Sequence, residues 1–189
     1  MKKPMLIISC HADTGFRSHR LVKLGGGVLQ GHLDNFVGVH AVMKAFFSGQ
    51  FDRDRVRIEL THGEECDMAG AVEVARTLSP NDLVLVVDVT AAPTDKDFVI
   101  EKCSEPRLQR FLRASLKGLR YDLYDFSPDP VSDVDETEVY AQKCSHVCFV
   151  GLPCWGGDYN RVAVRCRQAS INAVARALCR IAANFDKWR

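Results

Sequence analysis

The sequence of 189 residues lacks a long hydrophobic run, an excess of charge of one sign and any pair of cysteines spaced as CxxC. No stretch reaches the roughly 20 apolar residues of a transmembrane helix, so we expect no membrane partner. The apolar run in MKKPMLIISC is too short for a signal peptide, which predicts a cytoplasmic protein. With 25 Lys and Arg residues against 24 Asp and Glu residues, the net charge of +1 gives no reason to expect nucleic acid as a partner.

The eight cysteines do not have the spacing of a zinc ribbon. Several of them lie in apolar runs typical of strands, such as Cys148 in HVCFVGLP. A free cysteine packs as a small hydrophobic side chain, and disulfides are rare in reducing compartments. We therefore predict buried free thiols.

Short apolar runs alternate with segments of helical periodicity along the whole chain. The predicted strands are 4–10, 56–62, 82–90 and 146–153, with weaker candidates at 25–33 and 98–103. The predicted helices are 35–49, 67–78, 105–119, 135–144 and 168–185. The basic stretch RVAVRCRQ at 161–168 is expected to be a solvated strand-to-helix face. This alternation predicts a single α/β domain over residues 1–189, in three layers, with a mostly parallel or mixed sheet flanked by helices.

Ionisable side chains gather at the ends of the predicted strands, where α/β sheets place their ligands. The six residues concerned are His11, Asp13, Asp34, Glu64, Glu65 and Asp88. Taken alone, Asp34 is typical of a helix N-cap, and Glu64 and Glu65 are typical of first-turn charges. Asp88 is harder to explain, because an unpaired carboxylate inside LVLVVDVT would cost several kcal/mol. Together these side chains predict a site for a divalent metal.

The order HAD, LDNxxG, THGEE with a following GA, and VVD resembles the catalytic domain of the co-catalytic zinc exopeptidases, the clan of aminopeptidases and carboxypeptidases. The resemblance covers about residues 5–185. It implies a zinc exopeptidase-like, phosphorylase/hydrolase-like α/β core, and hydrolysis of peptide or related amide bonds.

The resemblance also implies a role for each of these positions. His11 would bind one metal, Asp34 would bridge two, and Glu65 and Asp88 would each bind one of them. The cofactor would be a divalent metal, zinc in the first place with Mn or Co as alternatives, as one or two ions.

Two further acids would take part in catalysis. Asp13 would not bind the metal itself but would orient the imidazole of the metal-binding histidine through its other ring nitrogen. Glu64 would be the general base that takes a proton from a water activated by the metals.

The sequence departs from this family where the last metal-binding histidine is expected. An ungapped count through VGLPCWGGDYN places Asp158 there, and no histidine follows His146. Asp158 is therefore a tentative metal ligand, with a turn residue in GGDYN as the alternative. If Asp158 is not a ligand, the second metal lacks one protein ligand or is absent.

The segments between the motifs are too short for the separate lid or dimerisation domain that many members of the family insert. We therefore expect the substrate pocket to form from the loops 14–24, 90–97 and 124–136. The acid-rich SDVDE at 132–136 favours a solvated turn, with binding of a substrate amine as the alternative. A neighbouring subunit could close the site, so a homo-oligomer is an expectation too.

These observations favour a metal-dependent hydrolase of peptide or N-acyl amide bonds, similar to an aminopeptidase, that acts on a small peptide or an acylated amino acid. The alternative is a metal-binding pseudoenzyme, or a partner-binding module, that keeps the peptidase fold. The histidine that is missing after His146 motivates this alternative.

Overall fold

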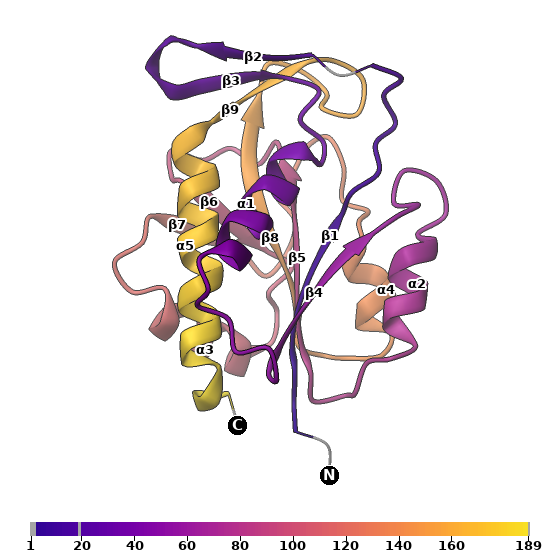
Figure 1. Ribbon diagram of the computed structural model, residues 1–189, viewed down its shortest axis with the longest axis vertical. Helices are drawn as coiled ribbons and strands as arrows, with labels where there is room; N and C mark the ends of the chain where they lie inside the picture. Colours follow the sequence, from indigo (N-terminus) through magenta and orange to yellow (C-terminus); the bar gives the residue numbers. More distant parts are fainter. Residues whose placement is uncertain (1–2, 19, 189) are drawn as a thin grey trace.

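A computed structural model describes residues 3–18 and 20–188 and shows a mixed sheet of nine strands with helices on both faces (Figure 1). The strands are β1 (Leu6–His11), β2 (Leu21–Leu24), β3 (Val28–Gly31), β4 (Val56–Thr61), β5 (Leu83–Thr90), β6 (Phe98–Glu101), β7 (Tyr121–Leu123), β8 (Val147–Trp155) and β9 (Val164–Arg167). The helices are α1 (Phe36–Phe47), α2 (Ala69–Ala75), α3 (Pro106–Ser115), α4 (Thr137–Ala141) and α5 (Gln168–Asn184), with short 3-10 turns at Gly25–Gly27 and Phe185–Lys187. The predicted α/β fold class is confirmed.

The centre of the sheet is parallel. Strand β1 lies between β4 and β5, and β5 also pairs with β8, all in the parallel direction. All eight residues of β5 are buried, as expected for a strand that is covered on both faces. Because these strands run in the same direction, their carboxyl ends meet at one edge of the sheet, where the predicted site residues lie.

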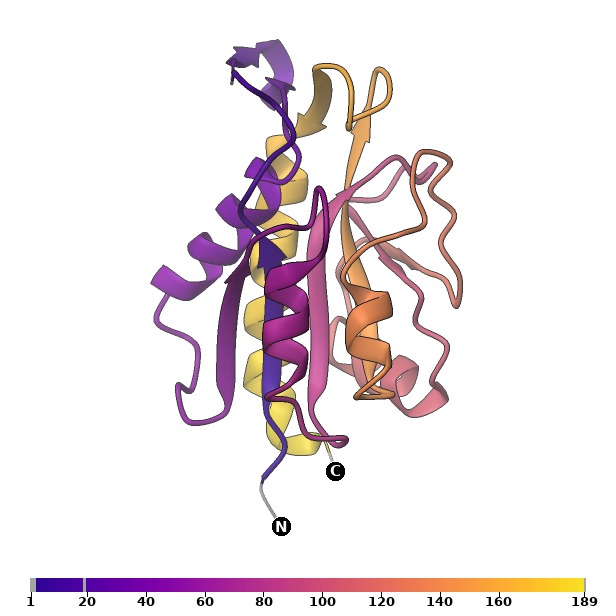
Figure 2. The ribbon, with the colours of Figure 1, turned by 90° about the vertical axis from the view of Figure 1, so that its right-hand side faces the viewer.

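Helices cover the two faces of this sheet unequally (Figure 2). Helices α1 and α5 pack together on one face, with α3 against α5, and α2 and α4 lie on the other face. Alternate residues of β1 show the division: Leu6 and Ile8 belong to the larger core under α1 and α5, whereas Ile7 belongs to the smaller core under α2 and α4. This three-layer arrangement agrees with the expectation from sequence.

Three short strands, β2, β7 and β9, have no counterpart among the predicted strands. Each has only three or four residues, too few to indicate a strand by themselves, and β2 exposes all four of its side chains although three of them are apolar. The basic stretch 161–168 does lead from a strand into a helix, because β9 ends where α5 begins. Within β9, Val164 and Cys166 are buried and Arg165 is exposed.

The cysteine prediction is confirmed for seven of the eight residues. All eight thiols are free, and all are buried except that of Cys66, which is exposed. In the described parts of the chain, no helix has the length and hydropathy of a transmembrane segment.

Candidate active site

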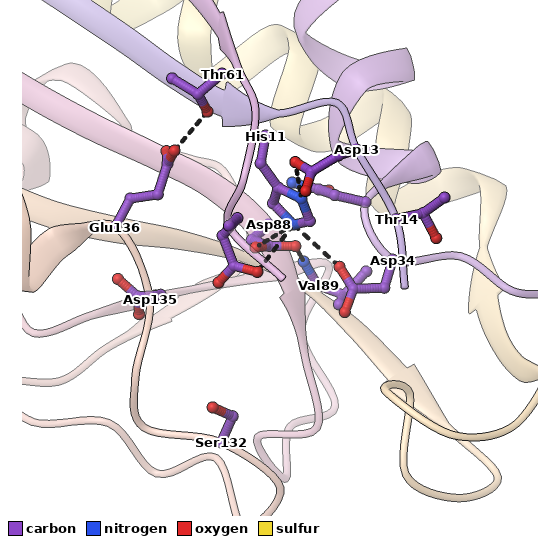
Figure 3. A network of polar contacts seen from close by, with 12 residues as sticks. His11, Asp13, Thr14, Asp34, Thr61, Asp88, Val89, Ser132, Asp135 and Glu136 are labelled. Atoms are coloured by element: carbon purple, nitrogen blue, oxygen red, sulfur yellow. Dashed lines mark hydrogen bonds and ion pairs between the residues drawn. The ribbon is translucent and has the colours of Figure 1, made fainter. Parts of the chain in front are cut away.

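Three of the predicted metal ligands converge on one point at the carboxyl edge of the sheet (Figure 3). The Nε2 atom of His11 lies 3.1 Å from Oδ1 of Asp34 and 3.0 Å from Oδ2 of Asp88. All three side chains are buried. The structure thus brings together a histidine and two carboxylates that are 23 and 77 residues further along the chain, at positions 34 and 88.

Neighbouring parallel strands position two of these ligands. His11 is the last residue of β1, and Asp88 lies in β5, two residues beyond the last β1–β5 register pair, Ser9 with Val86. Asp88 is fixed further because its Oδ1 accepts a hydrogen bond from the backbone N–H of Val89 at 2.6 Å. The two ligands therefore depend on the pairing of the sheet rather than on a mobile loop.

Asp34 does not cap helix α1. The N-cap residue is Asn35, and it makes no capping hydrogen bond with its side chain. Instead, Nδ2 of Asn35 donates a hydrogen bond to the carbonyl of Val87, at 2.8 Å, which ties the start of α1 to β5. Gly38 leaves the space that the Asn35 side chain fills. The LDNxxG motif therefore holds Asp34 beside its two partners.

The loop after β4 brings Glu64 and Glu65 to the same place. With His11 they form a second group whose candidate ligand atoms lie within 4.8 Å of one another. Oε2 of Glu64 lies 4.0 Å from Nε2 of His11. Gly70 lets helix α2 approach this loop, because a Cβ atom there would lie 2.5 Å from the backbone nitrogen of His62. This close approach explains the glycine of the GA that follows the THGEE motif.

Asp13 lies on the other side of the imidazole. Its Oδ1 is 3.5 Å from Nδ1 of His11, and neither of these buried atoms has a hydrogen-bond partner. This is the side from which a carboxylate would orient a metal-binding histidine.

The charges of the cluster are poorly balanced. Burial by itself lowers the pKa of His11, but the carboxylates of Asp88 and Asp34 outweigh it and raise that pKa to about 12. Burial raises the pKa of Glu64 to about 7, against the opposing effect of His11, and burial also raises the pKa of Asp88 and of Glu65. In the described residues, His11 is the only side chain that forms an ion pair with any of Asp13, Asp34, Glu64 and Asp88.

These residues fit a divalent metal. One N–H at Nε2 cannot donate well to two carboxylate oxygens at 3.0 and 3.1 Å at the same time. A cation placed among these atoms would instead accept an imidazole nitrogen and carboxylate oxygens as ligands, which is a donor set typical of zinc. It would also balance the negative charge of buried carboxylates that have no lysine or arginine partner in the described chain.

Asp158 does not join either group of metal-ligating side chains. Its Oδ1 accepts a hydrogen bond from the backbone N–H of Asn160 at 3.0 Å, and its Oδ2 lies 3.2 Å from Nε of Arg161. This is the geometry of the turn that the sequence left open as the alternative.

The 132–136 segment differs from the solvated turn that the sequence favours. Asp135 and Glu136 are buried, and the carboxylate of Glu136 accepts hydrogen bonds from the hydroxyls of Thr61 and of Ser9, the latter at 2.8 Å. The solvated-turn prediction is wrong for these two acids, because strand residues and Lys102 satisfy them in the interior. Figure 3 shows Glu136 and Asp135 on the side of the site where Ser132 also lies.

A small pocket adjoins the ligand cluster on this side. It is lined by Asp34, Glu64, Asp88, Val89, Glu101, Ser127, Asp129, Ser132, Val134, Asp135, Phe149, Tyr159 and Asn160. Of the three loops expected to form a substrate pocket, only 124–136 contributes to it; residue 19 of the segment 14–24 lies outside the described residues. Sequence reasoning missed Glu101 and Asp129, since the pairing of β6 with β8 was not predicted.

No protein-family model matches the chain, and no curated protein matches it in sequence. Solved structures of aminopeptidases share its fold. A TET aminopeptidase from a marine-sediment Thaumarchaeota archaeon matches with a TM-score of 0.73 at 14% identity, over 90% of this chain and 55% of that chain. An aminopeptidase from the archaeon Desulfurococcus kamchatkensis matches with a TM-score of 0.72 at 16% identity, over 88% of this chain and 52% of that one.

An M18-family aminopeptidase from Thermotoga maritima matches with a TM-score of 0.67 at 13% identity, over 86% of this chain and 48% of that chain. At these identities the likeness is one of fold. The chain therefore shares the α/β fold of these aminopeptidases, in agreement with the fold class that the sequence predicts. It spans about half the length of each of these aminopeptidases.

Proposed function

We propose that the protein is a metal-dependent hydrolase of peptide or N-acyl amide bonds, with aminopeptidase-like activity. The observation that carries this proposal is the convergence of His11, Asp34 and Asp88 on one point, with Glu64 beside them. The fold shared with solved aminopeptidases supports the same reaction class. The proposed substrates are small peptides or acylated amino acids.

His11, Asp34, Asp88 and Glu65 would hold one or two divalent ions, zinc in the first place, with Mn or Co as alternatives. When bound, the metal supplies a Lewis acid that polarises the scissile carbonyl and makes water a stronger nucleophile. Asp158 is left out of the proposed ligands because its carboxylate already pairs with Arg161 and the turn backbone.

The chain's own residues would do the rest. Asp13 would orient the imidazole of His11 through Nδ1, 3.5 Å away. Glu64 would be the general base, because its carboxylate lies 4.0 Å from Nε2 of His11 and its side chain is 15% exposed, so that it reaches both the cluster and the pocket. It would take a proton from the attacking water and pass it to the leaving amine.

The test uses the purified full chain, stripped with chelator and reloaded with zinc, manganese or cobalt. Each form is assayed on a panel of aminoacyl and N-acylamino amides, together with Glu64→Gln and a control, Glu73→Gln, which makes the same change on the exposed face of α2. We expect metal-dependent turnover that falls by about 10²-fold or more in Glu64→Gln and persists in Glu73→Gln. No turnover with any of the metals would overturn the proposal, and tight metal binding without turnover would favour a metal-binding pseudoenzyme.

A homo-oligomer belongs to the same proposal. One solved structure that matches with a TM-score of 0.72 is described as a dodecamer, and an assembly of copies could close the open side of the site. Size-exclusion chromatography with light scattering tests this part, and a monomer over the whole working concentration range would contradict it.

A further inference from the structure

The pocket next to the metal-ligating cluster is strongly acidic. Six carboxylate residues line it, and among its lining residues in the described chain there is no lysine or arginine; the six are Asp34, Glu64, Asp88, Glu101, Asp129 and Asp135. Its volume of about 30 Å³ is room for about two water molecules. Three of the six, Asp34, Glu64 and Asp88, lie near the imidazole of His11. The other three, Glu101, Asp129 and Asp135, form no ion pair with it in the described chain.

Gly151 of β8 lies between the strands that carry Asp88 and Glu101. In the sheet it lies directly between Asp88 of β5 and Val99 of β6, with which it forms register pairs. A Cβ atom at Gly151 would lie 3.0 Å from Oε1 of Glu101. Strand β8 separates β5 from β6, so Asp88 and Glu101 come from the two strands on either side of Gly151. The methyl group of Thr90 and the carboxylate of Glu101 occupy the space that a side chain at Gly151 would take, so the glycine is what lets the Glu101 carboxylate approach β8.

Glu101 is a buried carboxylate with an unsatisfied oxygen. The residue is 1% exposed, and its Oε2 accepts a hydrogen bond from the hydroxyl of Ser127 at 2.8 Å. Its Oε1 makes no hydrogen bond within the described residues, although the hydroxyl of Thr90 lies close enough to lower the pKa of the carboxyl, and Glu101 lines the pocket. Lys102 follows it in sequence, but the Lys102 ammonium lies 2.9 Å from Oδ2 of Asp135 and also binds Glu138. Asp135 is thereby balanced, and Glu101 is not.

Asp129 is held by neutral donors. Its Oδ2 accepts hydrogen bonds from the backbone N–H of Ala91 and the hydroxyl of Tyr159, both at 2.9 Å. Its Oδ1 accepts one from the N–H of Val131 at 2.8 Å. These bonds fix the carboxylate in place without cancelling its charge, and no ion pair of Asp129 or of Glu101 is present in the described residues. Glu101 is buried and Asp129 is half-buried, and a cation in the pocket would balance the negative charge that their neutral donors leave.

We propose, on the basis of the hydrolase function above, that this pocket is a subsite for the side-chain ammonium group of the substrate's first residue. Substrates that begin with lysine would then be preferred. An ammonium group is a compact cation with three donors, close in size to the water molecules that the cavity admits, so only this group would enter the cavity while its flexible four-carbon stem stays outside. Glu101 and Asp129 belong to neither group of three metal-ligating side chains in the described chain, so the geometry favours an organic cation over a further metal ion.

Binding of small amides to the full chain tests the subsite without any need for turnover. Calorimetry compares L-lysinamide with L-norleucinamide, whose side chain has a similar length and no ammonium group. The same comparison with both α-amines acetylated separates the side-chain ammonium from the α-ammonium. We expect lysine to bind at least about tenfold more tightly in both pairs. Equal binding of lysinamide and norleucinamide, or a preference that disappears on acetylation, would overturn the proposal.

Two variants locate the binding. Glu101→Gln keeps the shape of the side chain and an acceptor for Ser127, and it should remove most of the preference for lysine. Glu73→Gln, on the exposed face of α2, should keep the full preference. If Glu101→Gln does not fold, Asp129→Asn takes its place, and the comparison of ligands on the unmodified chain decides the question in either case. A preference for lysine that survives both Glu101→Gln and Asp129→Asn would contradict the assignment.

Hydrolysis assays separate this inference from the function on which it rests. Turnover of lysyl and norleucyl amides at equal kcat/KM would overturn the subsite and leave the hydrolase intact. Absence of all turnover, together with Glu101-dependent binding of lysinamide, would overturn the hydrolase and leave the subsite intact.

Discussion

The side-chain Oδ1 atom of Asn35 lies 1.9 Å from the position that a Cβ atom at Gly38 would occupy. Any side chain at Gly38 therefore has to push Asn35 away from the carbonyl of Val87, to which it is bonded. That bond joins Asn35 at the start of α1 to Val87 in β5, and these two residues directly adjoin Asp34 and Asp88 in the sequence. Packing within one helical turn thus determines the distance between two proposed metal ligands.

Gly38→Ala should lower the free energy of unfolding by about 1–3 kcal/mol, because the added methyl group overpacks a buried contact. It should also weaken zinc binding, since Asp34 moves with Asn35. Urea unfolding and zinc titration measure the two effects. Gly25→Ala is the control, because nothing lies within 4 Å of a Cβ atom there. Equal stability of the two variants would contradict the role given to Gly38.

Zinc should stabilise the folded chain, because a ligand that binds only the native state shifts unfolding by mass action. A free zinc concentration 100 times the dissociation constant corresponds to about 2.7 kcal/mol. Asp88→Asn should lose most of this gain in a thermal unfolding experiment. Asp158→Asn should keep it, since Asp158 pairs with Arg161 instead. A loss in Asp158→Asn as large as that in Asp88→Asn would place Asp158 among the ligands.

The stability of the metal-free chain should depend on the protonation of Glu101. Burial raises the pKa of Glu101, the nearby hydroxyls of Thr90 and Ser127 lower it, and the charges of Asp129 and Asp135 raise it further, with burial dominant. A carboxyl whose pKa is higher in the folded than in the unfolded state favours folding only while it is protonated. Its contribution is complete below the unfolded pKa and is lost as the pH rises through the folded pKa.

Glu101→Gln should therefore gain stability relative to the unmodified chain as the pH rises from about 4 to 8. Urea unfolding in the presence of chelator, at several pH values, measures the difference between the two proteins. Glu73→Gln provides the matched control and should show no such trend. A difference that stays constant over this pH range would mean that Glu101 is balanced in the folded chain.

A thiol reagent should label a single cysteine of the native protein. Cys66 is exposed, and the other seven thiols are buried, where burial raises the pKa of Cys10 and of Cys144 and makes their thiolates scarce. Mass spectrometry should show one adduct under native conditions and eight after unfolding. Cys66→Ser should remove the native adduct, and rapid labelling of a second site would show that one of the buried segments opens.

The sequence was sufficient to predict the parallel centre of the sheet, because β1, β5 and β8 are largely continuous apolar runs and β4 alternates apolar with polar residues. The five helices follow equally from their periodicity and end residues. The short strands β2 and β7 could not be predicted, since three or four residues carry almost no pattern, and β9 was expected only as part of the basic strand-to-helix stretch 161–168.

The convergence of His11, Asp34 and Asp88 was predictable because each lies at the same edge of a parallel sheet, and motif spacing supplied their partners. The burial of Glu136 was not predictable. Its partners, Ser9 and Thr61, lie more than 70 residues earlier in the chain, and an acid-rich loop has the same composition whether or not it packs inward. The acidity of the pocket has the same origin, since it depends on β6 pairing with β8.

Strand β8 belongs to two parts of the sheet at once. It pairs with β5 along seven residues, whereas it pairs with β9 through Cys154 with Cys166 and Trp155 with Arg165. The outer strands β2, β3 and β9 are thus attached to the centre by a narrow junction. Their amide hydrogens should exchange with deuterated solvent well before those of β5, because these outer strands can unfold locally while the edge that carries the proposed metal ligands stays folded.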